Sequence, residues 1–366
     1  MNLELEISPL MEWLPHEKPL IISGPCSAES EEQVHQTARA IAASGRLNVL
    51  RAGIWKPRTR PNSFEGLGAK ALPWLVSAAR DNGVMSATEV ANAQHVEQAL
   101  KAGVDILWVG ARTTVNPFSV QEIANAVQGV DVPVLVKNPI NPDLQLWIGA
   151  LERINRAGIT KIGAIHRGFS NSGKSIYRNQ PMWDLAIELK VLSPTLPIIC
   201  DPSHIAGNRE LLQVVSQRAL DLDMDGLMIE SHPIPDEAWS DAKQQITPKR
   251  LVKLLGELQV RSVTSESAEF LNQLEKLRAS IDKVDHNVLS WMSERMEIVE
   301  KIANYKKLNE VTILQVDRWN EIKKTRTELG KELGLSLDFI ADLIRIIHKE
   351  SIRKQTAIMN KMPDTE

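Results

Sequence analysis

The chain has 366 residues, of which 43% are apolar and 24% charged, and 43 basic and 46 acidic side chains give it a net charge of −3. At about 100–200 residues per domain the length predicts two or three domains, and the near-neutral balance gives no reason to expect nucleic acid or an acidic membrane as a partner. No apolar run approaches the ~20 residues that span a bilayer, and the start MNLELEISPL lacks the order of a secretory signal. We therefore expect a cytoplasmic protein.

From about residue 20 to 255 the chain repeats a short run rich in Val and Ile followed by a longer amphipathic stretch. The apolar runs are LIISGPCS (20–27), VLRAGI (49–54), VMSATEV (84–90), ILWVGA (106–111), VLVKN (134–138), KIGAIHR (161–167), IICDPSH (198–204) and GLMIESH (226–232). Glycines at which the intervening helices should end are Gly45, Gly83, Gly103, Gly129, Gly158 and Gly226. Eight strand–helix units predict a (β/α)₈ TIM barrel of the α/β class. An open doubly wound sheet is the alternative, but GPCSAES is not its glycine-rich phosphate loop.

The pattern changes near residue 260. We expect the barrel domain over 1–258, a polar linker over 259–267 and an all-α domain of three helices over 268–366. Apolar residues at helical spacing predict helices over about 267–305, 315–330 and 336–358. The first helix would be ~55 Å long, which is more than the two following helices can cover. We therefore expect a partner chain to bury the remainder of its apolar face.

Almost every predicted strand ends in a charged or metal-capable residue, and in a barrel these ends meet at one mouth. Six of these residues are cationic: Arg51, Lys56, Arg58, Arg112, Lys137 and Arg167. Any one alone would ordinarily be solvated or paired, but six like charges at one mouth repel each other unless an anion compensates. Guanidinium and ammonium groups bind phosphate and carboxylate, so we expect one or two phosphorylated metabolites as ligands.

A second set consists of Cys26, His204 and Glu230, together with Asp241 in the loop after the eighth run. A thiolate, an imidazole and two carboxylates suit a divalent transition metal. Their spacing has no metal signature, and a buried cysteine and a core histidine explain the same residues equally well. Position favours the metal, because three of the four follow different predicted strands. Cys200 lacks such partners and is expected in the core.

Seven ordered motifs span nearly all of residues 18–255: GPCSAES, RAGIWKPRT, WVGARTT, LVKNP, HRGF, DPSHIAG and ESHP. They resemble the short microbial 3-deoxy-D-arabino-heptulosonate-7-phosphate (DAHP) synthases. The resemblance implies condensation of phosphoenolpyruvate with erythrose 4-phosphate, the first step of the shikimate pathway, with a divalent metal such as Mn²⁺ held by Cys26, His204, Glu230 and Asp241.

The same resemblance assigns the cations of the mouth. Those implied for phosphoenolpyruvate are Arg51, Lys56, Arg112, Lys137 and Arg167. Arg58 and Thr59 of KPRT are implied for erythrose 4-phosphate, and since the related octulosonate-phosphate synthases lack KPRT, another phosphosugar is the alternative. Lys56 is the candidate proton donor to the developing alkoxide, and Glu89 or His166 is a candidate for positioning water.

Basic residues also occur at intervals along the predicted helices. Arg295 and Lys306 are 11 residues apart, so they share one helix face ~16 Å apart. Arg278 lies 17 residues before Arg295, ~25 Å along the helix and on another face. If both arginines bind one small ligand, one of them must come from a second subunit.

Residues 265–360 resemble the all-helical chorismate mutases through LRASIDKVDHNVLSWMSERMEIVEKIANYKK, then DRW, then ESIRKQ. The resemblance implies rearrangement of chorismate to prephenate by a homodimer. Its implied site residues are Arg278 from the partner, Arg295, Lys306, Arg318, Ser351 and Gln355, with Lys306 and Gln355 on the breaking ether bond. Gln315 and Trp319 stand where the family commonly has acidic residues. We expect this domain to mediate feedback inhibition as well. The alternatives are a tail that only senses a pathway product or one that only dimerises.

Overall fold

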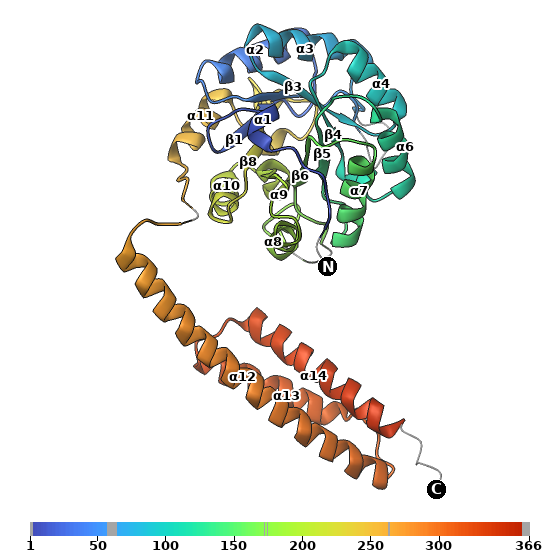
Figure 1. Cartoon of the computed structure of the whole chain (residues 1–366), viewed down its shortest axis with the longest axis vertical. Coiled ribbons are helices and arrows are strands. Elements are labelled where there is room, and N and C mark those ends of the chain that lie inside the picture. The colour runs from blue at the N-terminus through green and yellow to red at the C-terminus, as the bar shows by residue number, and fades with distance from the viewer. Residues whose placement is uncertain (1–2, 57–63, 172, 174, 263, 361–366) are drawn as a thin grey trace. The chain divides into compact units, whose positions relative to one another are not determined.

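The computed structural model describes residues 3–56, 64–171, 173, 175–262 and 264–360. The chain divides into two compact units, Met1–Val263 and Thr264–Glu366 (Figure 1). Among the described residues, no helix combines the length and the apolar character needed to cross a bilayer.

The first unit is a closed barrel of eight parallel strands that neighbour one another in chain order. The strands are β1 (Leu20–Gly24), β2 (Val49–Arg51), β3 (Met85–Val90), β4 (Ile106–Val109), β5 (Val134–Lys137), β6 (Ile162–His166), β7 (Ile198–Cys200) and β8 (Gly226–Glu230). Closure is made by β1 and β8, which pair in parallel from Leu20 with Gly226 to Gly24 with Glu230. Each strand begins within one residue of a predicted apolar run, and the predicted barrel is confirmed.

Helices surround the strands, as Figure 1 shows. They are α1 (Leu10–Trp13), α2 (Glu31–Ala42), α3 (Leu72–Asp81), α4 (Ala93–Ala102), α5 (Ala111–Thr114), α6 (Pro117–Val127), α7 (Leu144–Arg156), α8 (Trp183–Leu192), α9 (Pro202–Ala206), α10 (Leu212–Asp221) and α11 (Pro248–Glu257), with short 3₁₀ helices η1 (Gly68–Ala71), η2 (Pro235–Glu237) and η3 (Ala242–Gln244). The side chains of Ser30, Asn92 and Asp143 cap α2, α4 and α7 by accepting a backbone N–H three residues on.

Five of the six glycines expected to end helices do so with positive φ: Gly45, Gly83, Gly103, Gly129 and Gly158. The expectation for Gly226 is wrong, because this residue begins β8. A Cβ at Gly226 would lie 2.5 Å from the Leu20 carbonyl oxygen, so glycine is needed there for close strand contact.

Side chains alternate between two layers. One apolar cluster lies inside the barrel, and the other lies between the strands and the helices. The interior cluster includes Leu20, Ile22, Val49, Ala87, Ile106, Trp108, Leu135, Ile165, Ile199 and Met228. Trp13 and Leu14 belong to it as well, so α1 and the residue after it close the amino-terminal end of the barrel.

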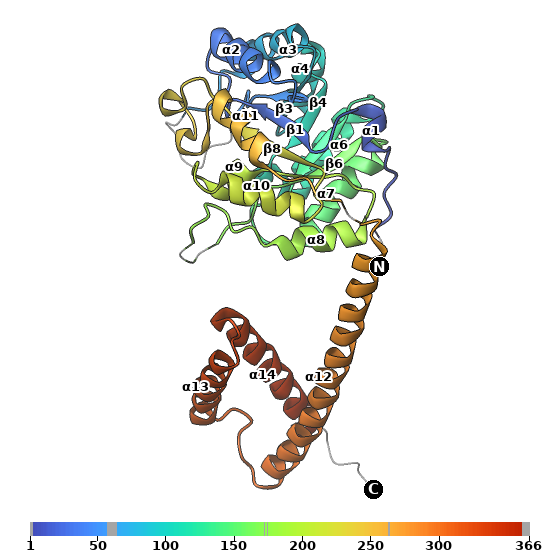
Figure 2. The ribbon, with the colours of Figure 1, turned by 90° about the vertical axis from the view of Figure 1, so that its left-hand side faces the viewer.

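The second unit contains α12 (Ala268–Leu308), α13 (Val316–Glu332) and α14 (Leu337–Met359), and α14 packs against both α12 and α13 (Figure 2). Ser267 and Ser336 cap α12 and α14. At 41 residues α12 is ~62 Å long. Its exposed large apolar residues include Phe270, Leu277, Ile281, Val284, Val288 and Trp291.

Candidate functional site

Polar side chains point into the barrel because successive side chains of a strand alternate between its two faces. In seven strands, an interior apolar residue is followed two residues later by a polar or aromatic side chain. These side chains are Arg51, Glu89, Trp108, Lys137, Arg167, Asp201 and Glu230. Because alternate side chains share one face of a strand, all seven belong to the interior at the carboxyl ends of the strands.

Two buried ion pairs lie at this mouth. Arg51 Nη1 is 2.7 Å from Glu230 Oε1, and Lys137 Nζ is 2.8 Å from Asp201 Oδ2, with all four side chains at most 4% exposed. The Trp108 ring lies beneath both cations, 5.0 Å from the Arg51 guanidinium carbon and 5.6 Å from Lys137 Nζ. These contacts hold two buried cations in fixed positions.

Arg167 is buried among neutral partners. Its Nη1 donates to Asn179 Oδ1 at 2.8 Å and to the Gly168 carbonyl at 3.3 Å. Burial lowers the pKa of Arg167 to about 10; Asp201 opposes this change, while Arg178 and Arg112 reinforce it. A buried guanidinium whose charge is poorly compensated favours an anionic ligand beside it.

The four residues expected to bind metal lie next to one another in pairs. Cys26 Sγ is 3.5 Å from Asp241 Oδ2, and His204 Nε2 is 3.8 Å from Glu230 Oε1. Among the described residues, no three His, Cys, Asp or Glu side chains are arranged to hold one ion as they stand. Cations of the chain contact two of these residues instead: Lys56 Nζ lies 2.9 Å from Cys26 Sγ, and Arg51 Nη1 lies 2.7 Å from Glu230 Oε1.

The donor atoms nevertheless suit a divalent ion. Asp201 caps α9 through the His204 amide, and its carboxylate also accepts from His204 Nδ1 at 2.8 Å. This bond leaves the lone pair of His204 Nε2 directed at the Glu230 side, which is the arrangement typical of a metal-binding histidine. Burial, followed by the Glu230 charge, raises the pKa of Cys26 to about 12, so a cation is needed to hold the thiolate.

The other predicted residues have varied positions. Arg112 is exposed at the start of α5, and Arg58 and Thr59 lie outside the described residues. The prediction that His166 positions water inside the barrel is wrong. Its side chain points away from the interior, because it lies between the inward residues Ile165 and Arg167, and its ring contacts Trp147, Phe169 and Trp183.

Sequence reasoning missed Arg178. This residue lies in the loop between β6 and α8, where Nη1 is 3.1 Å from Asp241 Oδ1 and 2.6 Å from Gln244 Oε1. Burial opposes ionisation of Asp241, but Arg178 outweighs it and holds the pKa of that carboxyl well below its usual range. Arg178 does not follow a predicted strand, so its contact with Asp241 can be identified only in the folded structure.

In the helical unit, three of the predicted residues gather between α12 and α14. Arg295 Nη1 donates to Ser351 Oγ at 2.8 Å, and Gln355 is 8% exposed, with a buried Oε1 that has no hydrogen-bond partner. Lys306 Nζ donates to the Ile313 carbonyl at 2.6 Å. Arg278 is distant along α12 and pairs with Glu275 on an exposed surface.

A cavity of about 380 Å³ opens beside Arg295. Its lining residues are Met292, Arg295, Arg318, Trp319, Ile322, Arg326, Leu329, Gly330, Leu333, Leu335, Ile340, Leu343, Ile344, Ile347 and His348. It combines cationic groups with an apolar wall, which suits a small anion with a hydrocarbon ring.

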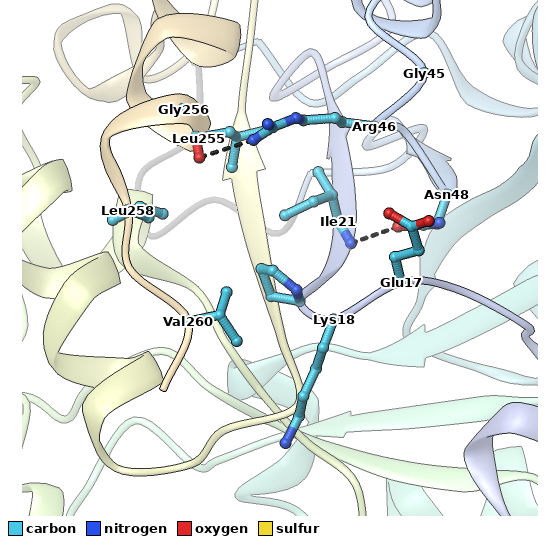
Figure 3. A pocket seen from close by; sticks show the side chains of 11 residues that line it. Glu17, Lys18, Ile21, Gly45, Arg46, Asn48, Leu255, Gly256, Leu258 and Val260 are labelled. Carbon is cyan, nitrogen blue, oxygen red and sulfur yellow. Dashed lines mark hydrogen bonds between the residues drawn. The ribbon is translucent and has the colours of Figure 1, made fainter. Parts of the chain in front are cut away.

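A hollow of about 500 Å³ lies at the opposite, amino-terminal end of the barrel (Figure 3). Arg46 Nη1 donates to the Leu255 carbonyl at 2.9 Å there, and Asn48 Oδ1 accepts from the Ile21 amide at 2.8 Å. These contacts tie the end of α11 to the starts of β1 and β2. This end of a barrel serves stability rather than chemistry.

Comparison with known proteins agrees with the division of the chain into a barrel unit and a helical unit. The DAHP synthetase I family model matches residues 15–265, and the chorismate mutase type II model matches residues 277–356. A phospho-2-dehydro-3-deoxyheptonate aldolase of Thermotoga maritima is 33% identical over 238 residues, which cover 65% of this chain and 68% of the relative. A 2-dehydro-3-deoxyphosphooctonate aldolase of Desulfotalea psychrophila is 27% identical over 271 residues, which cover 68% of this chain and 91% of the relative. A crystal structure of the Thermotoga maritima DAHP synthase superposes with a TM-score of 0.58 at 32% identity, covering 65% of this chain and 67% of that one.

Proposed function

This chain is a member of the DAHP synthetase I family that also carries a chorismate mutase type II domain, and from this membership we propose a bifunctional enzyme of the shikimate pathway. The barrel would condense phosphoenolpyruvate with erythrose 4-phosphate to give DAHP and phosphate. The helical domain would rearrange chorismate to prephenate. The proposed location is the cytoplasm.

The observation that carries the barrel proposal is the buried cationic floor. Arg51 and Lys137 are fixed over Trp108 by their ion pairs with Glu230 and Asp201, and the buried Arg167 donates to the neutral oxygens of Asn179 and Gly168. Phosphoenolpyruvate carries a phosphate and a carboxylate, which match guanidinium forks. Arg112 joins this group at the rim. Arg58 and Thr59 of KPRT would bind the phosphate of the acceptor sugar.

Cys26, His204, Glu230 and Asp241 would hold the divalent metal, for which Mn²⁺ is our proposal. When bound, the metal polarises the aldehyde of the acceptor sugar as a Lewis acid. The chain supplies the orientation: Asp201 fixes the His204 ring, and Arg178 holds the Asp241 carboxylate ionised.

Lys56 is placed to donate a proton to the developing alkoxide. Its Nζ lies 2.7 Å from the Cys26 carbonyl oxygen and 2.9 Å from Sγ. Burial disfavours the charge of Lys56, but Cys26 and Glu230 outweigh burial and raise its pKa. The amine therefore carries the proton that it would donate. The remaining candidate for orienting water at C2 is Glu89, which accepts from Trp108 Nε1 at 3.0 Å.

The helical site needs no nucleophile, because the rearrangement is pericyclic and depends on restraint and on donors aimed at developing charge. Arg295, Arg318 and Arg278 of a second copy would bind the two carboxylates. Lys306 and Gln355 would hydrogen-bond the ether oxygen, and Ser351 would help to seat the ring. The unpartnered amide oxygen of Gln355 supports a polar ligand beside it.

Two features support a homodimer through the helical domain. The exposed apolar residues of α12 need cover, and Arg278 lies ~25 Å along α12 from Arg295. A larger assembly is compatible with this. We further propose that prephenate or chorismate bound to the tail inhibits the barrel, which requires different affinity for two arrangements of the chain.

Loss of phosphoenolpyruvate absorbance on adding erythrose 4-phosphate tests the barrel. Chelator should abolish the rate, added Mn²⁺ should restore it, and Cys26→Ser should weaken metal binding. A chelator-insensitive rate would remove the metal assignment. Turnover of another phosphosugar alone would support the alternative acceptor.

Chorismate consumption by the pure protein tests the tail. If chorismate is stable, but prephenate protects the tail from proteolysis, the tail only senses ligand. If neither occurs, it only dimerises. For regulation, a barrel truncated near Leu258 should escape prephenate inhibition, and equal inhibition of that barrel and the full chain would contradict the proposal.

A further inference from the structure

Trp319 of α13 and His348 of α14 form a stacked pair in the cavity of the helical unit. Their ring centres are 3.8 Å apart and their planes differ by 16°. Lys323 Nζ also lies 5.5 Å from the Trp319 ring centre. Both rings line the cavity, so the stack forms part of its wall.

His348 shares a face of α14 with the proposed site residues. Ser351 and Gln355 follow it by three and seven residues, which places the three side chains along one side of the helix. Arg295 donates to Ser351 from the neighbouring helix. Both His348 and Arg295 line the cavity, so the imidazole borders the space assigned to the ring of the substrate.

The cavity is rich in donors and poor in acceptors. Its arginines and the Trp319 indole only donate hydrogen bonds, and its remaining described lining residues are apolar or glycine. Burial, reinforced by the positive charge of Arg295, lowers the pKa of His348, so its imidazole is neutral at pH 7. A neutral imidazole has one donor and one acceptor nitrogen, and His348 is thus the nitrogen acceptor among the described lining residues.

Resting on the proposed mutase function, we propose that His348, held in place by stacking on Trp319, hydrogen-bonds the ring hydroxyl of chorismate. Chorismate presents two carboxylates, an ether oxygen and one hydroxyl. The arginines and Lys306 with Gln355 match the first three, and the hydroxyl is matched by a group that can both donate and accept.

The test compares chorismate with an analogue that lacks the ring hydroxyl, using the full chain. His348→Phe keeps a stacking ring and removes both nitrogens. We expect kcat/KM for chorismate to fall about 10- to 100-fold, while kcat/KM for the analogue changes less than about 2-fold. His348→Gln, which restores an acceptor, should recover part of the loss. Lys349→Gln, a change at the exposed neighbouring residue, is the matched control and should leave both rates unchanged.

Equal losses on chorismate and the analogue would overturn the proposal, because they would mean that His348 only shapes the wall. Wild-type discrimination that persists in His348→Phe would overturn it as well. A wild-type protein that leaves chorismate unchanged, while Arg295→Ala behaves identically, would instead remove the mutase function on which the proposal rests. Far-ultraviolet circular dichroism of each variant separates these outcomes from loss of the helical fold.

Discussion

At the residue scale, the Arg51–Glu230 ion pair links the stability of the barrel to the proposed binding of phosphoenolpyruvate. Both side chains are almost fully buried, and Arg51 also lies over the Trp108 ring. Burial opposes ionisation of Glu230, but His204 and Arg51 outweigh it and lower its pKa. Each charge is therefore tolerated only because the other is present.

Arg51→Met should leave Glu230 charged and without its ion pair. We expect the free energy of unfolding of the barrel to fall by about 3–5 kcal/mol, together with loss of phosphoenolpyruvate condensation. Denaturant unfolding followed by tryptophan fluorescence measures the first effect. Arg39→Met, at an exposed position on α2, should change stability by less than about 0.5 kcal/mol. Equal stability of the two variants would contradict the pairing argument.

His166 is a neutral imidazole enclosed by aromatic rings. Its ring centre is 5.1 Å from that of Trp183 and 5.9 Å from that of Phe169. Burial, reinforced by Arg167, lowers its pKa to about 3. In the unfolded chain histidine takes up a proton near pH 6.5, so between about pH 6.5 and pH 3 acid favours the unfolded state.

His166→Phe should therefore make the barrel less sensitive to acid. Between pH 7 and pH 5 the free energy of unfolding of the wild type should fall by about 2 kcal/mol more than that of the variant. Urea titrations at the two pH values measure this difference. Parallel losses in both proteins would show that His166 is protonated in the fold, against the direction expected from its burial.

At the scale of elements, the barrel depends on close approach between neighbouring strands at their carboxyl ends. Gly24 ends β1 with φ of 151°, and a Cβ there would lie 2.1 Å from the Arg51 carbonyl oxygen of β2. No side chain can yield to relieve this contact, because the obstacle is backbone. Glycine at this point lets the strand that leads to Cys26 lie against the strand that bears Arg51.

Gly24→Ala should destabilise the barrel by more than about 2 kcal/mol and should lower metal affinity, because Cys26 follows two residues later. Gly83→Ala is the control: its φ of 65° is also positive, but no atom lies within 4 Å of the new Cβ. We expect that variant to lose only about 1 kcal/mol. Thermal unfolding and metal titration compare the two, and similar losses would refute the steric explanation.

The sequence was informative about elements because apolar periodicity and capping are local properties. The eight strands, the break near residue 260 and the extent of α12 could all be predicted in this way. Gly226 could not, since its glycine is required by the Leu20 carbonyl, a contact of distant segments. The contacts of Arg178 and His348 could not be predicted either. Arg178 contacts Asp241, 63 residues away, and His348 stacks on Trp319, 29 residues away, and no local sequence pattern indicates such contacts.

At the scale of the whole molecule, the net charge of −3 conceals two regions in which basic side chains are clustered. The barrel floor gathers Arg51, Lys137 and Arg167, and the helical cavity gathers Arg295 and Arg318. Arg278 cannot join the second region within one chain, because ~25 Å of helix separates it from Arg295. The proposed mutase site is therefore complete only in an assembly of at least two copies.

Shared sites predict complementation between inactive variants. Arg278→Ala and Arg295→Ala should each retain only ~1% of mutase activity. In a mixed dimer, one site combines an intact Arg295 with an intact Arg278, and the other site lacks both. Random pairing makes half of the dimers mixed, so co-expression should restore about a quarter of the wild-type chorismate turnover. Arg295→Ala co-expressed with Lys306→Ala is the matched control, and it should restore nothing because both residues belong to the same half of the site. Recovery in the control, or none in the first pair, would mean that each chain contains its whole site.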